Sequence, residues 1–228
     1  MMRARVLGRR VLLAWLPVQA FTASGVMQGP QVFTIDAANS HVLIQVGKAG
    51  MFGFAGHAHE VLAPSVNGRV SVEPDDWQRS SVSLEFNAAA LKVSGRDEPP
   101  GDVPQVQQVM LSEQVLDAKR FPTVAFRSRR VSVTPRAVNG LDLAIEGDLA
   151  LHGVTRQLTI HASATLRPDG LTARGTFVIR QTDFGIRPVT AAGGTVKVKD
   201  DVQIEFDLQA RRSDRTPPGP SSTRTRGS

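Results

Sequence analysis

Strict alternation of apolar and polar residues runs through most of the chain and constrains the fold more than any other feature. In the segment 141–151 the odd positions are apolar except for one glycine, whereas the even positions include Asp142, Glu146 and Asp148. A period of two places successive side chains on opposite faces of an extended strand. We therefore predict strands with one apolar face here and in three segments that alternate in the same way, 81–88, 158–166 and 201–208.

Turn signals separate the alternating segments at hairpin spacing. Glycine and asparagine tolerate the left-handed backbone that tight turns need, and Pro-Asp-Gly favours a turn as well. Strands joined by such short turns pair antiparallel, so the chain is predicted to be all-β, built as an antiparallel meander. The signals are Asn67-Gly68, Asn139-Gly140 and Pro168-Asp169-Gly170.

One segment departs from the strand pattern. Residues 103–118 contain few β-formers, and Val106, Val109 and Met110 recur at helical spacing. We predict a helical insertion here, with Ser112 capping a second short turn. About eight strands that are apolar on one face, plus this insertion, fit a sheet closed into an eight-stranded antiparallel barrel, because closure removes exposed strand edges.

The inward-facing residues decide whether such a barrel is filled or hollow. The chain has no tyrosine, two tryptophans and 5% aromatic residues, so bulky side chains that would fill the interior are scarce. A cavity for a long aliphatic guest and an interior filled by branched aliphatic side chains both fit the alternation. If the barrel is hollow, the lining is predicted to be Val42, Ile44, Val46, Val72, Leu84, Phe86, Leu143, Ile145, Ile160, Phe177, Ile204 and Phe206.

The first 28 residues have the layout of an export signal. Four arginines precede a short apolar run that is broken by Pro17, and Val18-Gln19-Ala20 places small residues before a cut after Ala20. We expect residues 1–28 to be a cleaved signal peptide and the mature protein to lie in the periplasm. An uncleaved anchor within 11–30 is the alternative, although its polar content makes it a poor membrane span.

The basic charge of the chain belongs to its two ends. Residues 211–228 are rich in Arg, Pro and Ser and carry almost no apolar residues, which predicts a disordered tail after a barrel domain at 30–210. The ends hold nine of the 27 basic and one of the 21 acidic residues, so residues 29–210 have a net charge of −2. Without a basic stripe in the body, we expect no nucleic-acid partner.

A pair of histidines raises the question of a metal site. In an extended strand His57 and His59 share one face, as two ligands of one divalent ion do, and His152 is the first candidate for a third ligand, with Asp183 the second. Hydrogen bonding at the rim of the barrel and contact with a ligand head group are the alternatives. For His152 itself, bracing a hairpin turn competes with facing the mouth of the cavity.

Catalytic motifs are missing from the sequence. Cysteine is absent, which excludes a thiol nucleophile and a disulfide framework. No Gly-x-Ser-x-Gly elbow occurs, and Asp183-Phe184-Gly185 lacks the companions of a kinase motif. We expect Asp183 to accept hydrogen bonds from Arg180 or backbone amides, and we expect neither a catalytic residue nor a cofactor.

Four stretches, in order, resemble motifs of the YceI-like family of exported, lipocalin-like barrels that bind polyisoprenoid lipids. The resemblance spans about 32–208 and implies an eight-stranded lipocalin-like barrel. Asn39 stands where the family usually has histidine, and Gly56–Glu60 replaces a stretch that is usually Gly, basic and Phe. The stretches are Phe33–Ser40, Leu116–Ser128, Gly147–Arg156 and, at the C-terminal end, Thr182–Ile186 followed by Asp200–Ile204.

The resemblance implies a carrier or scavenger of an apolar, isoprenoid-like lipid that touches membranes only transiently. The alternative is a metal-binding protein or metal-dependent enzyme that uses His57, His59 and His152. A third hypothesis, a filled barrel that acts through a surface partner, predicts that the interior holds no cavity.

Overall fold

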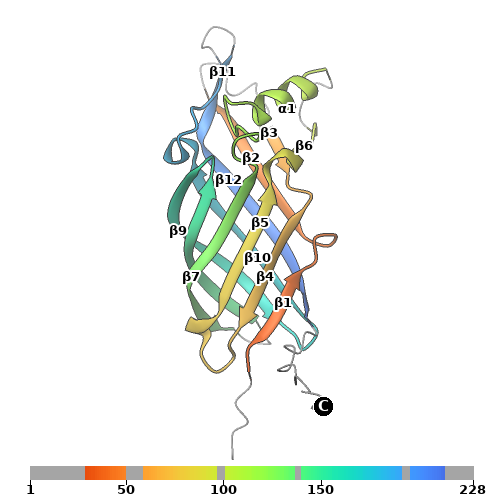
Figure 1. The fold of residues 1–228 in the computed structure, drawn as a ribbon, viewed down its shortest axis with the longest axis vertical. Coiled ribbons are helices and arrows are strands. Elements are labelled where there is room, and N and C mark those ends of the chain that lie inside the picture. The colour runs from red at the N-terminus through yellow and green to blue at the C-terminus, as the bar shows by residue number, and fades with distance from the viewer. Residues whose placement is uncertain (1–28, 50–58, 97–100, 137–139, 192–195, 214–228) are drawn as a thin grey trace, which may run out of the picture.

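The structure is a computed structural model, and it describes residues 29–49, 59–96, 101–136, 140–191 and 196–213. Within them, strands dominate and a single α-helix, α1 (Val103–Leu111), lies near one end of the molecule (Figure 1). No described helix is long and apolar enough to cross a membrane. The strands are β1 (Gln31–Ile35), β2 (His41–Ala49), β3 (His59–Leu62), β4 (Val66–Val72), β5 (Ser81–Asn87), β6 (Lys92–Val93), β7 (Thr123–Pro135), β8 (Gly140–Leu151), β9 (Val154–Leu166), β10 (Gly170–Arg180), β11 (Thr190–Ala191) and β12 (Val196–Arg212).

These strands form a closed, eight-stranded antiparallel barrel, as predicted. The ring runs β1-β4-β5-β7-β8-β9-β10-β12 and closes where β12 pairs with β1. Three of the eight positions in the ring are each occupied by two successive strands. Strand β2 continues the line of β1, β3 lies in line with β4, and β6 continues the line of β5. The long strand β12 bridges β1 and β2, pairing with β2 through its first half and with β1 through its last residues.

Three 3-10 helices complete the described elements, η2 (Trp77–Arg79), η3 (Ala88–Ala90) and η4 (Gln181–Phe184). Because η2 joins β4 to β5 and α1 follows β6, these two elements lie at opposite ends of the barrel. We call these ends the η2 end and the α1 end; the α1 end is uppermost in Figure 1.

The wall is incomplete in two places at the α1 end. Among the described residues β6 pairs only with β3, and β9 pairs with β10 only between 162–166 and 171–175. The first gap is covered by α1, whose Gln107 side chain accepts from the Val93 amide at 2.8 Å and donates to the Leu91 carbonyl at 2.9 Å. The second is covered by the η4 segment, which packs against β9, β10 and β12.

One predicted turn is wrong. Asn67 and Gly68 lie inside β4 and pair with Glu85 and Leu84 of β5. This position requires glycine because no side chain fits there. A Cβ atom on Gly68 would lie 2.8 Å from the Leu84 side chain and closer still to the Ser83 carbonyl. The hairpins β7–β8 and β9–β10 form as predicted, although residues 137–139 of the first turn lie outside the described part of the chain.

Two boundaries differ from the predicted ones. The helix ends at Leu111, and a short turn over 113–116 follows. Ser112 caps this turn as predicted, since its hydroxyl accepts from the Gln114 amide at 3.3 Å while it donates to the Val109 carbonyl at 2.7 Å. Strand β12 continues through Arg212, so the first residues of the predicted tail belong to the barrel. Arg211 forms an ion pair with Asp36 at 2.6 Å, which ties the end of β12 to the turn after β1. The predicted signal peptide and the remainder of the tail lie outside the described residues.

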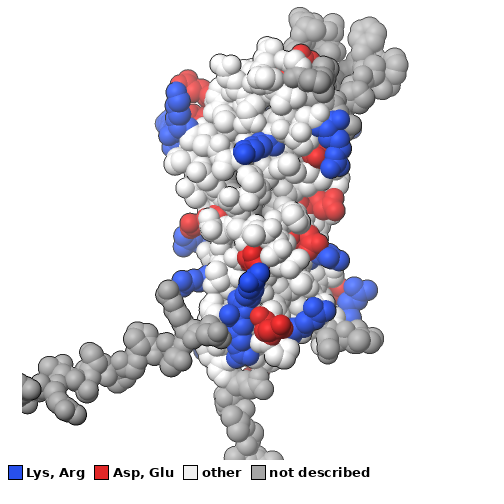
Figure 2. Space-filling view, turned by 90° about the vertical axis from the view of Figure 1, so that its right-hand side faces the viewer, with Lys and Arg blue, Asp and Glu red and all other residues white. Residues whose placement is uncertain are grey.

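The outer surface carries both signs of charge side by side (Figure 2). Ion pairs join neighbouring strands along the wall, and their side chains are half or more exposed on the arginine side, so each contributes little to stability. Among the described residues on the face in Figure 2, charges of both signs alternate and form no single-sign stripe of the kind that binds nucleic acid. The pairs are Arg127–Glu85, Arg129–Asp148, Arg136–Asp142 and Arg174–Asp207.

Candidate functional site

The barrel encloses a cavity of about 760 Å³, within the range of small-molecule sites. The interior is therefore not filled by its own side chains, which answers the question that the alternation left open. Strand residues of the inward parity supply most of the lining, and nearly all of them are aliphatic or phenylalanine. All twelve residues predicted as the lining do surround this cavity; that they contact a ligand stays a prediction.

The cavity stays open because glycines let large side chains lie along the wall. A Cβ atom on Gly175 would lie 2.6 Å from Cζ of Phe206, and one on Gly147 would lie 2.5 Å from Cζ of Phe126. Gly175 is the direct cross-strand partner of Phe206, just as Gly68 is of Leu84. A side chain in place of each glycine would force its neighbour toward the centre, so these glycines determine the volume of the cavity.

Polar groups gather at the α1 end of the cavity. Six polar residues line it there, and we call them the mouth: His59, Asp102, Gln105, Gln114, Gln181 and Thr190. Asp102, Gln105 and Gln114 are exposed although they also line the cavity, so solvent reaches the cavity here. Val106, Val109 and Met110 of α1 add apolar surface just inside the mouth.

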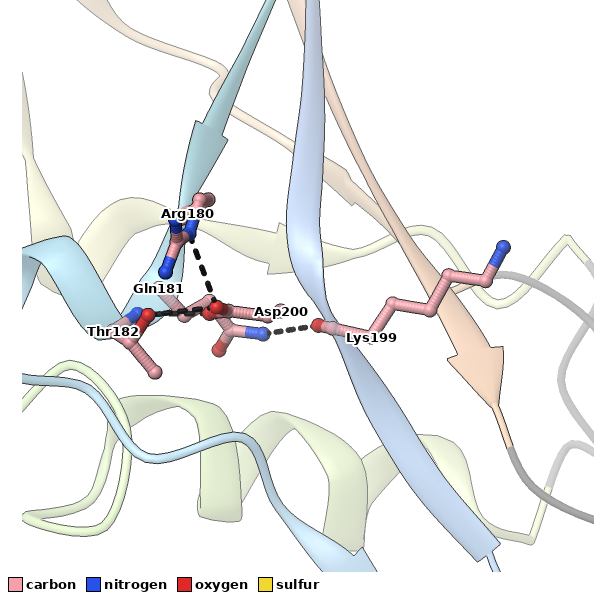
Figure 3. A network of polar contacts seen from close by, with 5 residues as sticks. All are labelled: Arg180, Gln181, Thr182, Lys199 and Asp200. Carbon is pink, nitrogen blue, oxygen red and sulfur yellow. Dashed lines mark hydrogen bonds and ion pairs between the residues drawn. The ribbon is translucent and has the colours of Figure 1, made fainter.

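A hydrogen-bond network fixes one side of the mouth (Figure 3). Asp200 accepts from the Thr182 hydroxyl at 2.7 Å and from its backbone amide at 2.9 Å, while Gln181 donates to the Lys199 carbonyl at 2.7 Å. Arg180 donates to Asp200 at 3.4 Å, so of the two donors predicted for Asp183, Arg180 or backbone amides, the structure pairs Arg180 with a different carboxylate. The hydrogen bonds from Thr182, with Arg180 nearby, lower the pKa of Asp200 below its ordinary value of 3.8.

His152 fastens the η4 segment to the barrel wall. It occupies the first position of the two-residue turn between β8 and β9, with positive φ at both His152 (51°) and Gly153 (73°). Its Nδ1 lies 3.1 Å from the Phe184 carbonyl oxygen, which only accepts, so this nitrogen carries the proton. Its ring packs edge-on against Phe121 with centroids 5.0 Å apart. His152 thus braces the structure and does not line the cavity.

Of the three histidines of the metal hypothesis, the structure describes His59 and His152, and only His59 lines the cavity. His59 lines the cavity beside Val61, whereas His152 bonds to Phe184 outside it. His57 lies outside the described residues. Among the residues that are described, no group of three or more His, Asp or Glu side chains is placed to hold a metal ion.

The sequence did not reveal the residues that cover the two incomplete places in the barrel wall. Gln107 is one of several glutamines in α1, and no sequence pattern distinguishes the one that meets the edge of β6. Gln181 is buried at the mouth, and no sequence pattern marks it as a lining residue. The apolar face of α1 was visible in its helical spacing, but its contribution to the cavity depends on where the helix packs.

Comparisons with known proteins agree with this geometry. The sequence profile of the YceI-like domain family matches residues 33–210. The fold is similar to that of BcnA from Burkholderia cenocepacia, with 18% sequence identity and a TM-score of 0.59 over 77% of this chain and 98% of that one.

Two further solved structures share the fold. A polyisoprenoid-binding domain from Saccharophagus degradans matches with 12% identity and a TM-score of 0.58 over 79% of this chain and 98% of that one. The YceI protein of Campylobacter jejuni matches with 12% identity and a TM-score of 0.52 over 68% and 85%. A search among curated proteins found no match. The profile match extends over most of the barrel, and the chain belongs to the YceI-like family.

Proposed function

We propose that this protein binds an apolar, isoprenoid-like lipid inside its barrel and serves as a periplasmic carrier or scavenger of that lipid. The observation that carries the proposal is the open cavity of about 760 Å³ with an almost wholly apolar lining. An aliphatic guest gains about 25 cal/mol for each Å² of apolar surface that leaves water. Away from the mouth, the polar lining residue that the structure describes is Ser80, whose hydroxyl already accepts from the Glu73 amide.

The mouth gives the guest an orientation. Its amide and carboxylate groups suit a polar head group that remains in contact with water, while the tail extends toward the η2 end. A related structure is described as a polyisoprenoid-binding domain, which supports the same class of guest here. Contact with a membrane is needed only while the lipid is collected or delivered.

A binding role explains the lining better than catalysis does. Nucleophile, base and oxyanion donors would have to converge on one point of the cavity. The described polar lining residues instead lie on separate elements around the mouth, on β3, β11, η4 and α1 with its flanking residues, while Ser80 lies at the η2 end. The periplasmic location rests on the sequence of residues 1–28, with its arginines, short apolar run and small residues before the expected cleavage point.

Uptake of geranylgeraniol by cavity-filling variants tests the proposal. Ile145 and Phe177 face the cavity from β8 and β10, so Ile145→Trp and Phe177→Trp should reduce geranylgeraniol binding at least about tenfold, the effect of excluding roughly two CH₂ groups. Val178 follows Phe177 on the same strand but is 58% exposed on the outer face. Val178→Trp is the matched control and should bind like the parent.

Equal geranylgeraniol binding by the parent and by both inward variants, with all proteins folded by circular dichroism, would contradict the proposal. Loss of binding in Val178→Trp alone would place the site on the outer surface of the barrel.

A further inference from the structure

Trp77 stands where the cavity ends. The indole lines the cavity, yet the residue is only half-buried, so it separates the cavity from solvent. It lies in the connection between β4 and β5, whose adjoining ends pair through Ser71 and Ser81. This connection is at the η2 end, away from the mouth.

The segment that carries Trp77 is held by its own hydrogen bonds. The Ser80 hydroxyl accepts from the Glu73 amide at 3.0 Å, and the Ser80 amide donates to the Trp77 carbonyl at 3.0 Å. Asp76 accepts from the Gln78 amide at 3.2 Å, which caps η2. Segment η2 also packs against β7 on the neighbouring wall. The backbone that carries Trp77 is therefore held in place, and its side chain packs against the buried core of the barrel.

We propose that Trp77 closes the cavity at the η2 end and sets the maximum length of the lipid tail that the barrel accepts. This inference rests on the proposed function and specifies its substrate class. If each non-hydrogen atom of the guest takes roughly the 30 Å³ of a liquid water molecule, 760 Å³ holds roughly 25 such atoms. That is close to geranylgeraniol and far short of solanesol.

The position of the mouth gives the tail its direction. Exposed polar residues line the cavity only at the α1 end in the described part of the chain, so the head group stays there and the end of the tail approaches the indole. Each CH₂ that becomes enclosed strengthens binding by about fourfold. Affinity should rise with tail length until the tail reaches Trp77, and further length should add nothing.

Native mass spectrometry of the full chain with an equimolar mixture of geraniol, farnesol, geranylgeraniol and solanesol tests this limit. We expect occupancy to rise up to geranylgeraniol and solanesol to gain no advantage over it. In Trp77→Ala, and in the milder Trp77→Leu, the tail can pass the former plug. The ratio of solanesol to geranylgeraniol binding should then rise by at least about tenfold, the effect of roughly two more enclosed CH₂ groups.

A matched control changes the neighbour of Trp77 that does not line the cavity. Gln78 follows Trp77 in η2 and is exposed, so Gln78→Ala should leave the length limit unchanged. Fluorescence gives a second readout that a purely structural role would not produce. In the full chain with Trp15→Phe, Trp77 is the only indole. Its emission should shift to shorter wavelength with geranylgeraniol and not with geraniol.

The outcomes separate this inference from the proposed function. A parent protein that binds prenols with no levelling beyond geranylgeraniol, or Trp77 variants that keep the parent's limit, would overturn the role of Trp77 and leave the lipid-binding proposal intact. A parent that binds no prenol of any length would overturn both.

Discussion

At the residue scale, the hollow interior depends on glycines that face inward. Gly68, Gly147 and Gly175 each lie beneath a large side chain of the adjacent strand, which therefore lies against the wall. Because these three positions have no Cβ atom, the neighbouring leucine and phenylalanine side chains can lie flat on the wall. They line the cavity and leave its centre open. The barrel thus combines a closed sheet with an open centre.

Substitution of Gly175 tests this account. Gly175→Ala places a Cβ atom 2.6 Å from both Phe206 and the His161 carbonyl, so the ring must move inward and the strands must separate slightly. We expect the free energy of unfolding to fall by about 1–3 kcal/mol, as in other overpacked interiors, and farnesol binding to weaken. Chemical denaturation and titration measure the two effects.

Gly29→Ala is the control, since nothing lies within 4 Å of the added Cβ atom. It should change the free energy of unfolding by less than about 0.5 kcal/mol. An unchanged stability and unchanged binding in Gly175→Ala would show that the glycine does not hold the cavity open.

At the scale of elements, two short segments complete the wall where strand pairing stops. Gln107 of α1 satisfies the backbone of β6, and His152 and Arg156 hold the η4 segment through the carbonyls of Phe184 and Asp183. Side chains thus bond to backbone groups that a neighbouring strand would otherwise satisfy. Both segments border the mouth, so its shape depends on a few side chains.

Gln107→Ala should loosen α1 without unfolding the barrel. The change leaves the Val93 amide and the Leu91 carbonyl without their partner, and we expect a loss of about 1–3 kcal/mol in the free energy of unfolding. Amide hydrogen exchange should accelerate in α1 and β6 and remain slow in β8 and β9. The exposed neighbour Gln108 offers the control Gln108→Ala, and equal exchange in the two variants would argue against the clamp.

The elements that could be predicted from the sequence are those whose pattern is local. Alternation within 141–151 and 158–166 sufficed to assign both strands and their inward faces. Asn67-Gly68 misled because a glycine that makes room for Leu84 has the same sequence signature as a turn. The contacts of Gln107 and Trp77 could not be predicted, because they depend on how distant segments meet in space.

At the scale of the whole molecule, two carboxylates make stability depend on pH. The side-chain hydrogen bond from Asn39, with Arg211 beside it, holds the pKa of Asp36 below 3.8, and the bonds from Thr182 lower the pKa of Asp200 in the same way. A carboxyl group whose pKa is lower in the folded state contributes stability above its unfolded pKa and loses it as the pH falls through the folded pKa. Both groups join segments distant in the sequence.

We therefore expect the Tm to fall as the pH drops below about 3.8, with little contribution from these two groups to pH dependence at neutral pH. Asp200→Asn should lower the Tm near neutral pH and make the decline in acid shallower. Differential scanning calorimetry across this range measures both. The same acid slope in parent and Asp200→Asn would show that Asp200 is not one of the groups responsible.

The central claim is that the barrel holds an apolar lipid, and native mass spectrometry of the protein purified from the periplasm tests it most directly. Spectra recorded with and without a chelator should show a bound mass of several hundred daltons that survives chelation and extracts into organic solvent. A stoichiometric transition metal in its place, lost with the chelator and in His57→Ala, would contradict the claim and support the metal alternative.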